Sequence, residues 1–327
     1  MTVRQFAKIF GAIGLGITLS LQSLCIQAQE YPSKPIKLIV PVATGAAFDS
    51  VTRLLAEKLR NKWGQPVVVE NRAGASHNMG AEVVSRSAPD GYTMLFAPPP
   101  ALVINKSLFS KLAFEPEAFV PVSVVVSTYN VLVVNASLPV ENIQQLIAYA
   151  KANPEKLNYA SAGSGSTPHL AAEMFKTMAG VKIAHIPFKG TSQAILELMG
   201  GRVDIMFSDI GLALPHIRSG KLRVLAVASE KRSSVLPETP ALSEVLPGFL
   251  SILWLGVVAP AGTPPAIANQ FSGAISEILK QPDVANRLQE MNFDPVGSTP
   301  AAMQTFMAQE RVRWKKVIHE SGATAEQ

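Results

Sequence analysis

The chain has 327 residues, of which 48% are hydrophobic and 16% are charged. That length and composition indicate a globular protein with one large domain or two ordinary ones, and no low-complexity tract predicts disorder. Lys and Arg outnumber Asp and Glu by 29 to 24, and this net charge of +5 is too small and too dispersed to indicate a nucleic-acid partner.

The first 28 residues have the pattern of a secretory signal peptide. Arg4 and Lys8 precede an apolar run over residues 9–21, and a short polar stretch ends in Ile-Gln-Ala at residues 26–28. This pattern predicts cleavage near Ala28. An uncleaved anchor is the alternative, although the run is shorter than the ~20 apolar residues that a spanning helix needs.

Cysteine usage agrees with export, because the single cysteine, Cys25, lies in the segment that would be removed. The mature chain would then hold no disulfide, no thiolate nucleophile and no cysteine metal ligand. Removal of residues 1–28 leaves 27 basic against 24 acidic residues, a net charge of +3.

From residue 31 onward the chain alternates strand-like and helix-like runs. The expected strands cover residues 36–41, 67–70, 93–97, 131–134, 157–160, 183–187, 203–207, 222–228 and 252–259. The expected helices cover residues 50–59, 80–86, 143–150, 170–178, 192–199, 267–279 and 301–320. This alternation predicts the α/β class, with a parallel or mixed sheet covered by helices, and the pattern restarts near Asn130 as a second α/β unit.

Two glycine-containing turns each follow a strand-like run and open an amphipathic helix. The first reads PVATGAAFD at residues 41–49, and the second reads AGSGSTPH at residues 162–169. The first N–H groups of a helix have no partner within the helix, so such a turn binds an anion well. We therefore expect these two turns, which lie in separate halves of the chain, to close on one small anion. We call them the two jaws of the site.

The first turn offers candidate ligand-binding residues at Thr44, Gly45, Ala46 and Ala47, of which the last three would donate backbone N–H groups. Asp49 has two alternative roles: it caps the helix N-terminus, or it orders a bridging water or contacts a ligand ammonium or hydroxyl. Its own charge would repel a ligand carboxylate, so we do not expect a direct contact with one.

In the second turn, Ser164, Gly165, Ser166 and Thr167 can supply hydroxyl and backbone N–H groups. Capping by Ser166 or Thr167 is compatible with binding, because the two roles use different atoms. His169 comes next, either as a donor to the ligand or as a packed structural residue.

Four further candidates lie at the ends of expected strands, where open α/β sheets place their ligands. Ser208 and Asp209 follow the strand at 203–207. Ala97 and Pro98 end the strand at 93–97 and could form a wall of the site.

Eight short motifs, each weak alone, together carry a family resemblance through their order and spacing. They lie at residues 31–36, 64–74, 88–93, 157–161, 185–190, 200–204, 215–222 and 259–265. With them the chain resembles, over residues 31–322, the periplasmic solute-binding receptors of tripartite tricarboxylate transporters, known as Bug receptors.

The resemblance implies two Rossmann-like domains around a ligand cleft, the periplasmic-binding-protein type, with residues 29–128 and 252–327 in domain 1 and residues 129–251 in domain 2. It implies a non-enzymatic receptor in the periplasm of a Gram-negative bacterium. The receptor would capture a small organic carboxylate, held largely by backbone N–H groups and ordered water, for uptake by the membrane permease subunits. It implies a monomer with no cofactor, no metal, no catalytic residue and no nucleic-acid partner.

The first turn departs from the family pattern, which usually reads Pro-Gly-Gly with Asp two residues later. Here it reads Thr44-Gly45-Ala46, with Asp49 retained. Ala46 adds a Cβ that restricts the turn, and Phe48 would add an apolar wall. These departures favour a less polar pocket, for an aromatic or branched carboxylate.

Other functions fit the residues less well. A carboxylate sensor that feeds a signalling partner would share the fold. An exported hydrolase that used Ser164 or Ser166 with His169 would lack the G-x-S-x-G elbow. Neither turn matches G-x-G-x-x-G or carries a P-loop lysine, and the five histidines are scattered without metal-ligand spacing.

Overall fold

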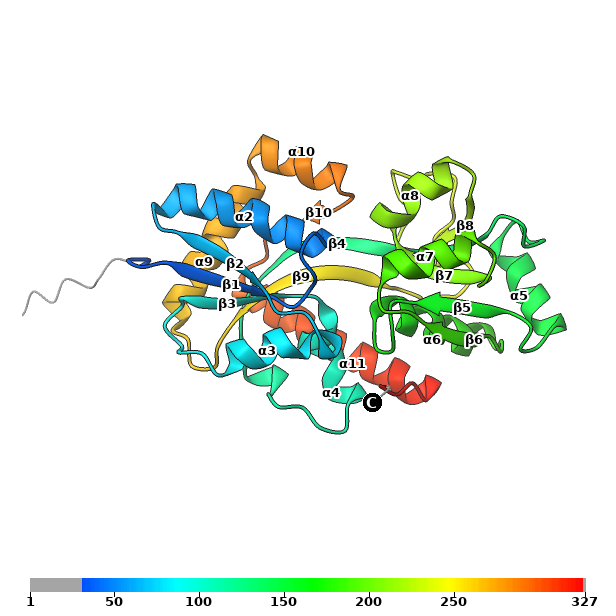
Figure 1. The fold of residues 1–327 in the computed structure, drawn as a ribbon, viewed down its shortest axis with the longest axis horizontal. Helices are drawn as coiled ribbons and strands as arrows, with labels where there is room; N and C mark the ends of the chain where they lie inside the picture. Colours follow the sequence, from blue (N-terminus) through cyan, green and yellow to red (C-terminus); the bar gives the residue numbers. More distant parts are fainter. Residues whose placement is uncertain (1–30, 326–327) are drawn as a thin grey trace, which may run out of the picture.

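The computed structural model describes residues 31–325, so the predicted signal peptide and its cleavage near Ala28 lie outside the described residues. Figure 1 shows two lobes joined by two long strands, β4 (Val120–Asn135) and β9 (Ile252–Ala259). The α/β class predicted from the alternation of elements is confirmed. Within the described part of the chain, no helix is both long enough and apolar enough to cross a membrane.

The strands form one mixed sheet in the order β2-β1-β3-β9-β4-β7-β5-β6, with β8 and β10 also paired to β4. The shorter strands are β1 (Ile36–Val40), β2 (Val67–Asn71), β3 (Thr93–Ala97), β5 (Asn158–Ser161), β6 (Ala184–Pro187), β7 (Ile205–Asp209), β8 (Leu222–Val227) and β10 (Asp294–Pro295). In the first lobe β1 is parallel to β2 and β3, and in the second lobe β5 is parallel to β6 and β7. Each turn therefore follows a parallel strand, β1 or β5.

Strand β4 is continuous where the sequence predicts only a strand at 131–134 and a domain boundary between residues 128 and 129. Its residues 120–129 pair with β9, and its residues 130–134 pair with β7. Beside this change of partner, Asn130 donates its Nδ2 hydrogen to Ser251 Oγ at 2.8 Å. Asn130, near which the sequence pattern restarts, is held in the strand by this hydrogen bond.

The helices cover both faces of the sheet. They are α2 (Ala47–Trp63), α3 (Asn78–Ser85), α4 (Asn105–Leu108), α5 (Ile143–Ala152), α6 (Thr167–Ala179), α7 (Thr191–Met199), α8 (Ile210–Arg218), α9 (Pro265–Leu279), α10 (Pro282–Glu290) and α11 (Pro300–Ser321). Short helical turns lie at η2 (Ala75–His77), η3 (Pro100–Ile104), η4 (Pro116–Ala118) and η5 (Leu242–Glu244). Of these, α4, α8, α10 and the four short turns have no counterpart among the predicted elements. The three consecutive prolines at residues 98–100 lead into η3, because proline suits the first helical position.

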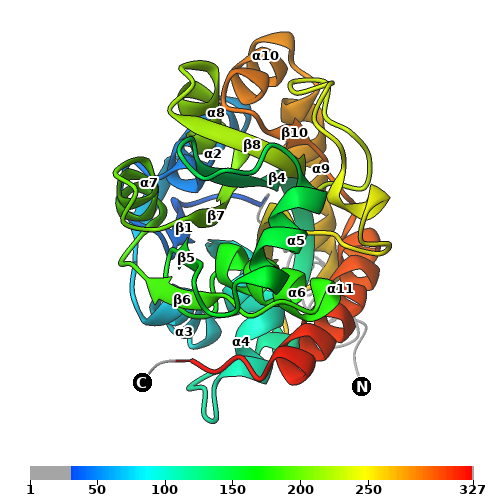
Figure 2. The same cartoon turned by 90° about the vertical axis from the view of Figure 1, so that its right-hand side faces the viewer.

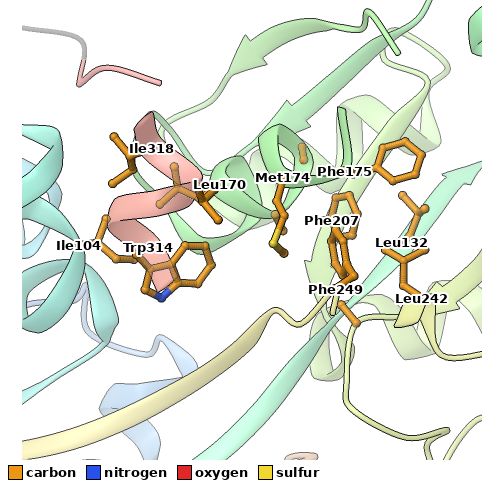
Figure 3. Packing of buried hydrophobic residues seen from close by; sticks show 14 of the residues in the cluster. Ile104, Leu132, Leu170, Met174, Phe175, Phe207, Leu242, Phe249, Trp314 and Ile318 are labelled. Carbon is orange, nitrogen blue, oxygen red and sulfur yellow. The ribbon is translucent and has the colours of Figure 1, made fainter. Parts of the chain in front are cut away.

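Side chains alternate along β1, and their packing shows which helices cover each face of the sheet. Ile36, Leu38 and Val40 pack with α2 and α9, whereas Ile39 packs into the cluster that includes α3 and α11. The same large cluster also spans the two lobes. Figure 3 shows Trp314 and Ile318 of α11 in one cluster with Ile104 of η3 and Leu170 of α6. In Figure 2, α11 runs beside α6. The lobes therefore share one apolar core on the α11 side.

Candidate functional site

The two predicted turns have the same backbone arrangement. Gly45 and Gly165 both have left-handed backbones, with φ of +83° and +81°, which glycine adopts without strain. The Gly45 N–H donates to Asp49 Oδ2 at 2.8 Å, and the Gly165 N–H donates to His169 Nδ1 at 3.1 Å. In each turn a glycine N–H is thus accepted by the side chain four residues later.

This arrangement changes the roles expected of the two glycines and of Asp49. Because both glycine N–H groups have protein acceptors, they are not the donors that a ligand would meet in this conformation. Of the alternative roles of Asp49, that of helix N-cap is wrong: helix α2 begins at Ala47 with Ala46 as N-cap, and the Asp49 side chain accepts the Gly45 N–H from within the first helical turn. In each turn, the side chain four residues after the glycine therefore fixes the turn conformation by accepting the glycine N–H.

Other donors in the first helical turns remain available. Helices begin three residues before the predicted starts, at Ala47 and Thr167. Among residues 31–325, the N–H groups of Ala47, Phe48 and Asp49 in α2 and of Thr167 in α6 have no hydrogen-bond partner. The predicted anion site therefore moves from the glycines to the helix N-termini that follow them.

Capping by Ser166 is confirmed, because its Oγ accepts the His169 N–H at 3.4 Å. The same hydroxyl donates to the Gly163 carbonyl at 2.7 Å. In the first turn, the corresponding N-cap is Ala46, which has no side-chain cap.

Asp49 belongs to a polar network that ties the first turn to β2. Its Oδ1 accepts from Asn71 Nδ2 at 2.9 Å, and its Oδ2 accepts from Arg53 Nε at 3.0 Å. Asn71 Nδ2 also donates to the Val42 carbonyl at 3.0 Å. Burial by itself raises the pKa of Asp49, but the hydrogen bonds from Arg53, the Gly45 N–H and Asn71 lower it overall. Asp49 is therefore ionised and fully engaged beneath the turn.

Arg53 and Asn71 were missed by sequence reasoning. The spacing of four residues between Asp49 and Arg53 on one helix is a usable signal for the ion pair. Asn71 ends β2, 22 residues from Asp49, and no local pattern indicates that it meets Asp49.

His169 lies in a stack of aromatic rings beneath the second turn. Its ring centroid is 4.4 Å from that of His185, which in turn is 4.7 Å from Tyr159. Burial lowers the pKa of His169 to about 4, against a smaller opposing effect of Glu173. Its neutral ring accepts the Gly165 N–H through Nδ1, which places its proton on Nε2. His169 therefore positions the turn, whichever ligand contact its Nε2 makes.

The turns differ in their surroundings. Thr44, Gly45 and Ala47 are exposed, whereas Gly165 and Thr167 are buried. A Cβ built on Gly165 would lie 2.3 Å from Leu108 Cδ2 of α4, whereas one built on Gly45 would meet nothing within 4 Å. The second turn is packed against the first lobe, and the first turn is open.

The remaining candidates are mostly engaged in packing or capping. Phe48 packs on Phe293, with ring centroids 5.6 Å apart. Asp209 is the N-cap of α8 and accepts the Leu212 N–H at 2.9 Å, and burial raises its pKa. The buried Ser208 donates to the Asp209 carbonyl at 3.2 Å.

Ala97 and Pro98 are buried at the end of β3. Ser164 is half-buried in the second turn.

Two surface pockets lie away from both turns. One is lined by Ser85, Arg86, Ala113, Phe114, Glu115, Ala118, Phe119 and Ala261. The other is lined by Ala136, Ser137, Leu138, Pro139, Val140, Glu141, Gln145 and Arg223. Across residues 31–325, no group of three or more His, Cys, Asp or Glu side chains could hold a metal ion.

Residues 51–323 match the family model of the tripartite tricarboxylate transporter family receptor. The chain is 37% identical to protein BugT of Bordetella pertussis over 322 residues, which cover 98% of this chain and 99% of the relative.

Three solved structures are similar over their whole length. A protein of R. palustris solved with adipate has a TM-score of 0.83 and 33% identity, and covers 91% of this chain and 100% of its own. The periplasmic binding protein BugD has a TM-score of 0.79 and 32% identity, and the match covers 90% of this chain and 100% of BugD. MatC from Rhodopseudomonas palustris, solved with bound malate, has a TM-score of 0.78 and 31% identity, with 88% and 100% covered.

Proposed function

Because the chain belongs to the tripartite tricarboxylate transporter receptor family, we propose that it captures a small organic carboxylate between its two lobes for uptake by such a transporter. The family resemblance inferred from the eight motifs is confirmed, as is the periplasmic-binding-protein type of fold. The adipate and malate bound by two similar proteins support the choice of ligand class.

One observation of this structure carries the proposal: the same turn precedes a helix in each lobe and leaves N–H groups that have no partner within residues 31–325. Ala47 and Phe48 provide them in the first lobe, and Thr167 provides one in the second. An anion at a helix N-terminus is stabilised by these donors and by the helix dipole. The Asp49 charge lies beneath the turn and is paired with Arg53, so the donors face the ligand while the carboxylate does not.

The family places the receptor in the periplasm, as for BugD. We extend the proposal to cleavage of the leader near Ala28, a monomeric receptor and delivery to membrane permease subunits. We also propose the domain division at residues 128/129 and 251/252, which agrees with the change of partner of β4 and the start of β9 at Ile252.

The proposal includes binding without catalysis. The Ser166 hydroxyl donates to the Gly163 carbonyl, and its oxygen accepts the backbone N–H of His169. This geometry does not activate Ser166 as a nucleophile, since its hydroxyl proton points at a carbonyl and not at a base. Turnover of any member of an ester panel would contradict this part of the proposal.

Calorimetry against a library of mono-, di- and tricarboxylates and amino acids tests the proposal. Ala47→Pro and Thr167→Pro remove one free N–H from each jaw at a helical position where proline is tolerated. We expect each to weaken binding by about tenfold, the equivalent of one charge-assisted hydrogen bond.

The matched control is Thr191→Pro, at the first position of α7, outside both turns. It should leave the affinity unchanged. The proposal fails if no carboxylate binds, and the assignment of the donors fails if Ala47→Pro and Thr167→Pro bind as tightly as the unaltered chain.

A further inference from the structure

A loop after β2 has an unusual backbone that the proposed binding mode does not explain. Ala75, Ser76 and His77 have φ of +46°, +51° and +75°, three consecutive non-glycine residues in the left-handed region. Non-glycine residues rarely adopt this region. Such conformations persist where surrounding contacts hold them, and they cluster at ligand sites.

The loop is held by Asn105, the first residue of α4. Asn105 Nδ2 donates to the Ser76 carbonyl at 2.8 Å and to Asn78 Oδ1 at 2.7 Å. A carbonyl can only accept, so the contact with Ser76 fixes which end of the Asn105 amide is nitrogen. Both hydrogens of Nδ2 are thereby used, and the orientation of Oδ1 is settled.

Two buried polar atoms at this place lack partners within residues 31–325: Asn105 Oδ1 and His77 Nδ1. Asn105 is fully buried, so its Oδ1 cannot be satisfied by bulk water. A buried polar group without a partner is rare and points to a ligand or a bound water. Burial also lowers the pKa of His77 to about 4, against a smaller effect of the Ser76 carbonyl, so the ring is neutral near pH 7.

Asn105 Oδ1 lies against the second turn, and the helix that follows the loop lies against the first. Asn105 Oδ1 is 4.0 Å from a Cβ built on Gly165, which places it against the second turn. On the other side, a Cβ built on Gly80 of α3 would lie 2.9 Å from Pro41 Cβ, so the helix that follows the loop touches the start of the first turn. The loop is therefore connected to the second turn through Asn105 and to the first turn through α3.

We propose that Asn105 Oδ1 and His77 Nδ1 form a subsite that reads a hydrogen-bond donor on the ligand, a hydroxyl or an amino group beside its carboxylate. This proposal rests on the proposed function. A carboxylate oxygen cannot satisfy Asn105 Oδ1, because both are acceptors, whereas a ligand O–H or N–H can. The neutral His77 ring accepts from an amino group, and either donates to or accepts from a hydroxyl.

The consequence is a preference within the carboxylate class. A site built to hydrogen-bond a polar group discriminates against the analogue that lacks it, because the buried acceptor is then left unpaired. The receptor should therefore bind a hydroxy or amino acid more tightly than the plain acid of the same length.

Calorimetry on matched ligand sets tests this preference. The sets are propionate, lactate and alanine; succinate, malate and aspartate; and adipate, 2-hydroxyadipate and 2-aminoadipate. In the set whose length fits, we expect the hydroxy or the amino acid to bind at least about tenfold tighter than the plain acid. The two substituted arms distinguish a hydroxyl from an ammonium as the donor.

His77→Gly removes the imidazole and relieves the left-handed backbone, so the variant should fold at least as well as the unaltered chain. It should reduce the preference by about fivefold or more. Ser76→Gly is the matched control, since it relieves the neighbouring strained residue and retains both unpaired atoms, and it should keep the preference.

Equal or tighter binding of the plain acid overturns the subsite and assigns the unpaired atoms to a bound water. Retention of the full preference in His77→Gly removes His77 from the subsite. Binding of the plain acids without any preference contradicts this inference alone, whereas failure of all nine acids and of the wider library contradicts the proposed function as well.

Discussion

In the first turn an ionised carboxylate accepts the glycine N–H, whereas in the second turn a neutral imidazole does so. Asp49 is ion-paired with Arg53 and hydrogen-bonded to Asn71, and His169 is stacked on His185. The backbones agree although the supporting side chains have different charge. The shared feature is thus the helix N-terminus, which both supports leave open to a ligand.

The two turns also differ in the residues that surround them. The first turn is open at Gly45, whereas the second packs against Leu108 of the other lobe. We infer that the second turn is part of the contact between the lobes, and that the first turn has room for variation. This agrees with the departures from the family pattern, which lie at Thr44, Ala46 and Phe48 in the first turn.

Alanine at each glycine tests that contrast most strongly. Gly165→Ala should lower the free energy of unfolding by about 4 kcal/mol, because it combines a left-handed alanine with a contact on Leu108. Gly45→Ala should cost about 1 kcal/mol, from the backbone alone. Urea unfolding of both variants measures the difference, and equal losses would contradict the different packing of the turns.

The pH dependence of stability distinguishes Asp49 from His169, the two side chains that accept the glycine N–H groups. The pKa of His169 is about 4 in the folded state, below its ordinary value near 6.5, so the unfolded state takes up the proton first. Its contribution to stability is complete above pH 6.5 and falls as pH drops to 4, by roughly 3 kcal/mol in total. The pKa of Asp49 is lowered, so its contribution is lost only as pH falls below the ordinary carboxyl range.

Urea unfolding between pH 7 and pH 4 measures this loss, and His169→Asn should remove part of it. The pKa of His77 is also about 4, so His77 also lowers the free energy of unfolding as pH falls. It should account for the pH dependence that remains in His169→Asn. The free energy of unfolding of the double variant, His169→Asn with His77→Gly, should therefore depend less on pH than that of either single variant. An unaltered pH profile in His169→Asn would show that its ring is not buried as a neutral group.

Exchange of the N-cap residues gives the smallest effect. Ser166→Ala removes a side-chain cap and should cost about 1 kcal/mol. Ala46→Ser introduces a cap at a residue with the same backbone angles, φ near −65° in both, and should stabilise by a similar amount. Thermal unfolding measures both.

Ala46→Ser should also weaken ligand binding, because the new hydroxyl would accept an N–H that the proposed site offers to the ligand. Tighter binding in this variant would place the ligand elsewhere than at the N-terminus of α2.

The strands next to the turns were predicted well because their patterns are local. Strand β9 has the predicted bounds, and β1 and β5 differ from the predictions by one residue. The helices α4, α8 and α10 were not predicted. Helix α4 has only four residues, too few to show a helical period, α8 contains Pro215, and α10 begins at Pro282. Strand β4 was predicted only in part, because its polar residues are stabilised by a partner more than one hundred residues away, such as Ser251 for Asn130.

The amino-acid sequence by itself determined the α/β alternation, the family and the two glycine turns, because each rests on residues adjacent in the chain or on their periodicity. Only the tertiary structure decided that Asp49 and His169 accept the glycine N–H groups, that Gly165 lies against Leu108, and that Asn105 Oδ1 has no partner among the residues that the structure describes. Those facts depend on contacts among residues whose side chains meet through the packing of the elements, and hydrogen bonds compete for the same donors there. A local pattern indicates which groups are present, whereas packing decides which of them remain free for a ligand.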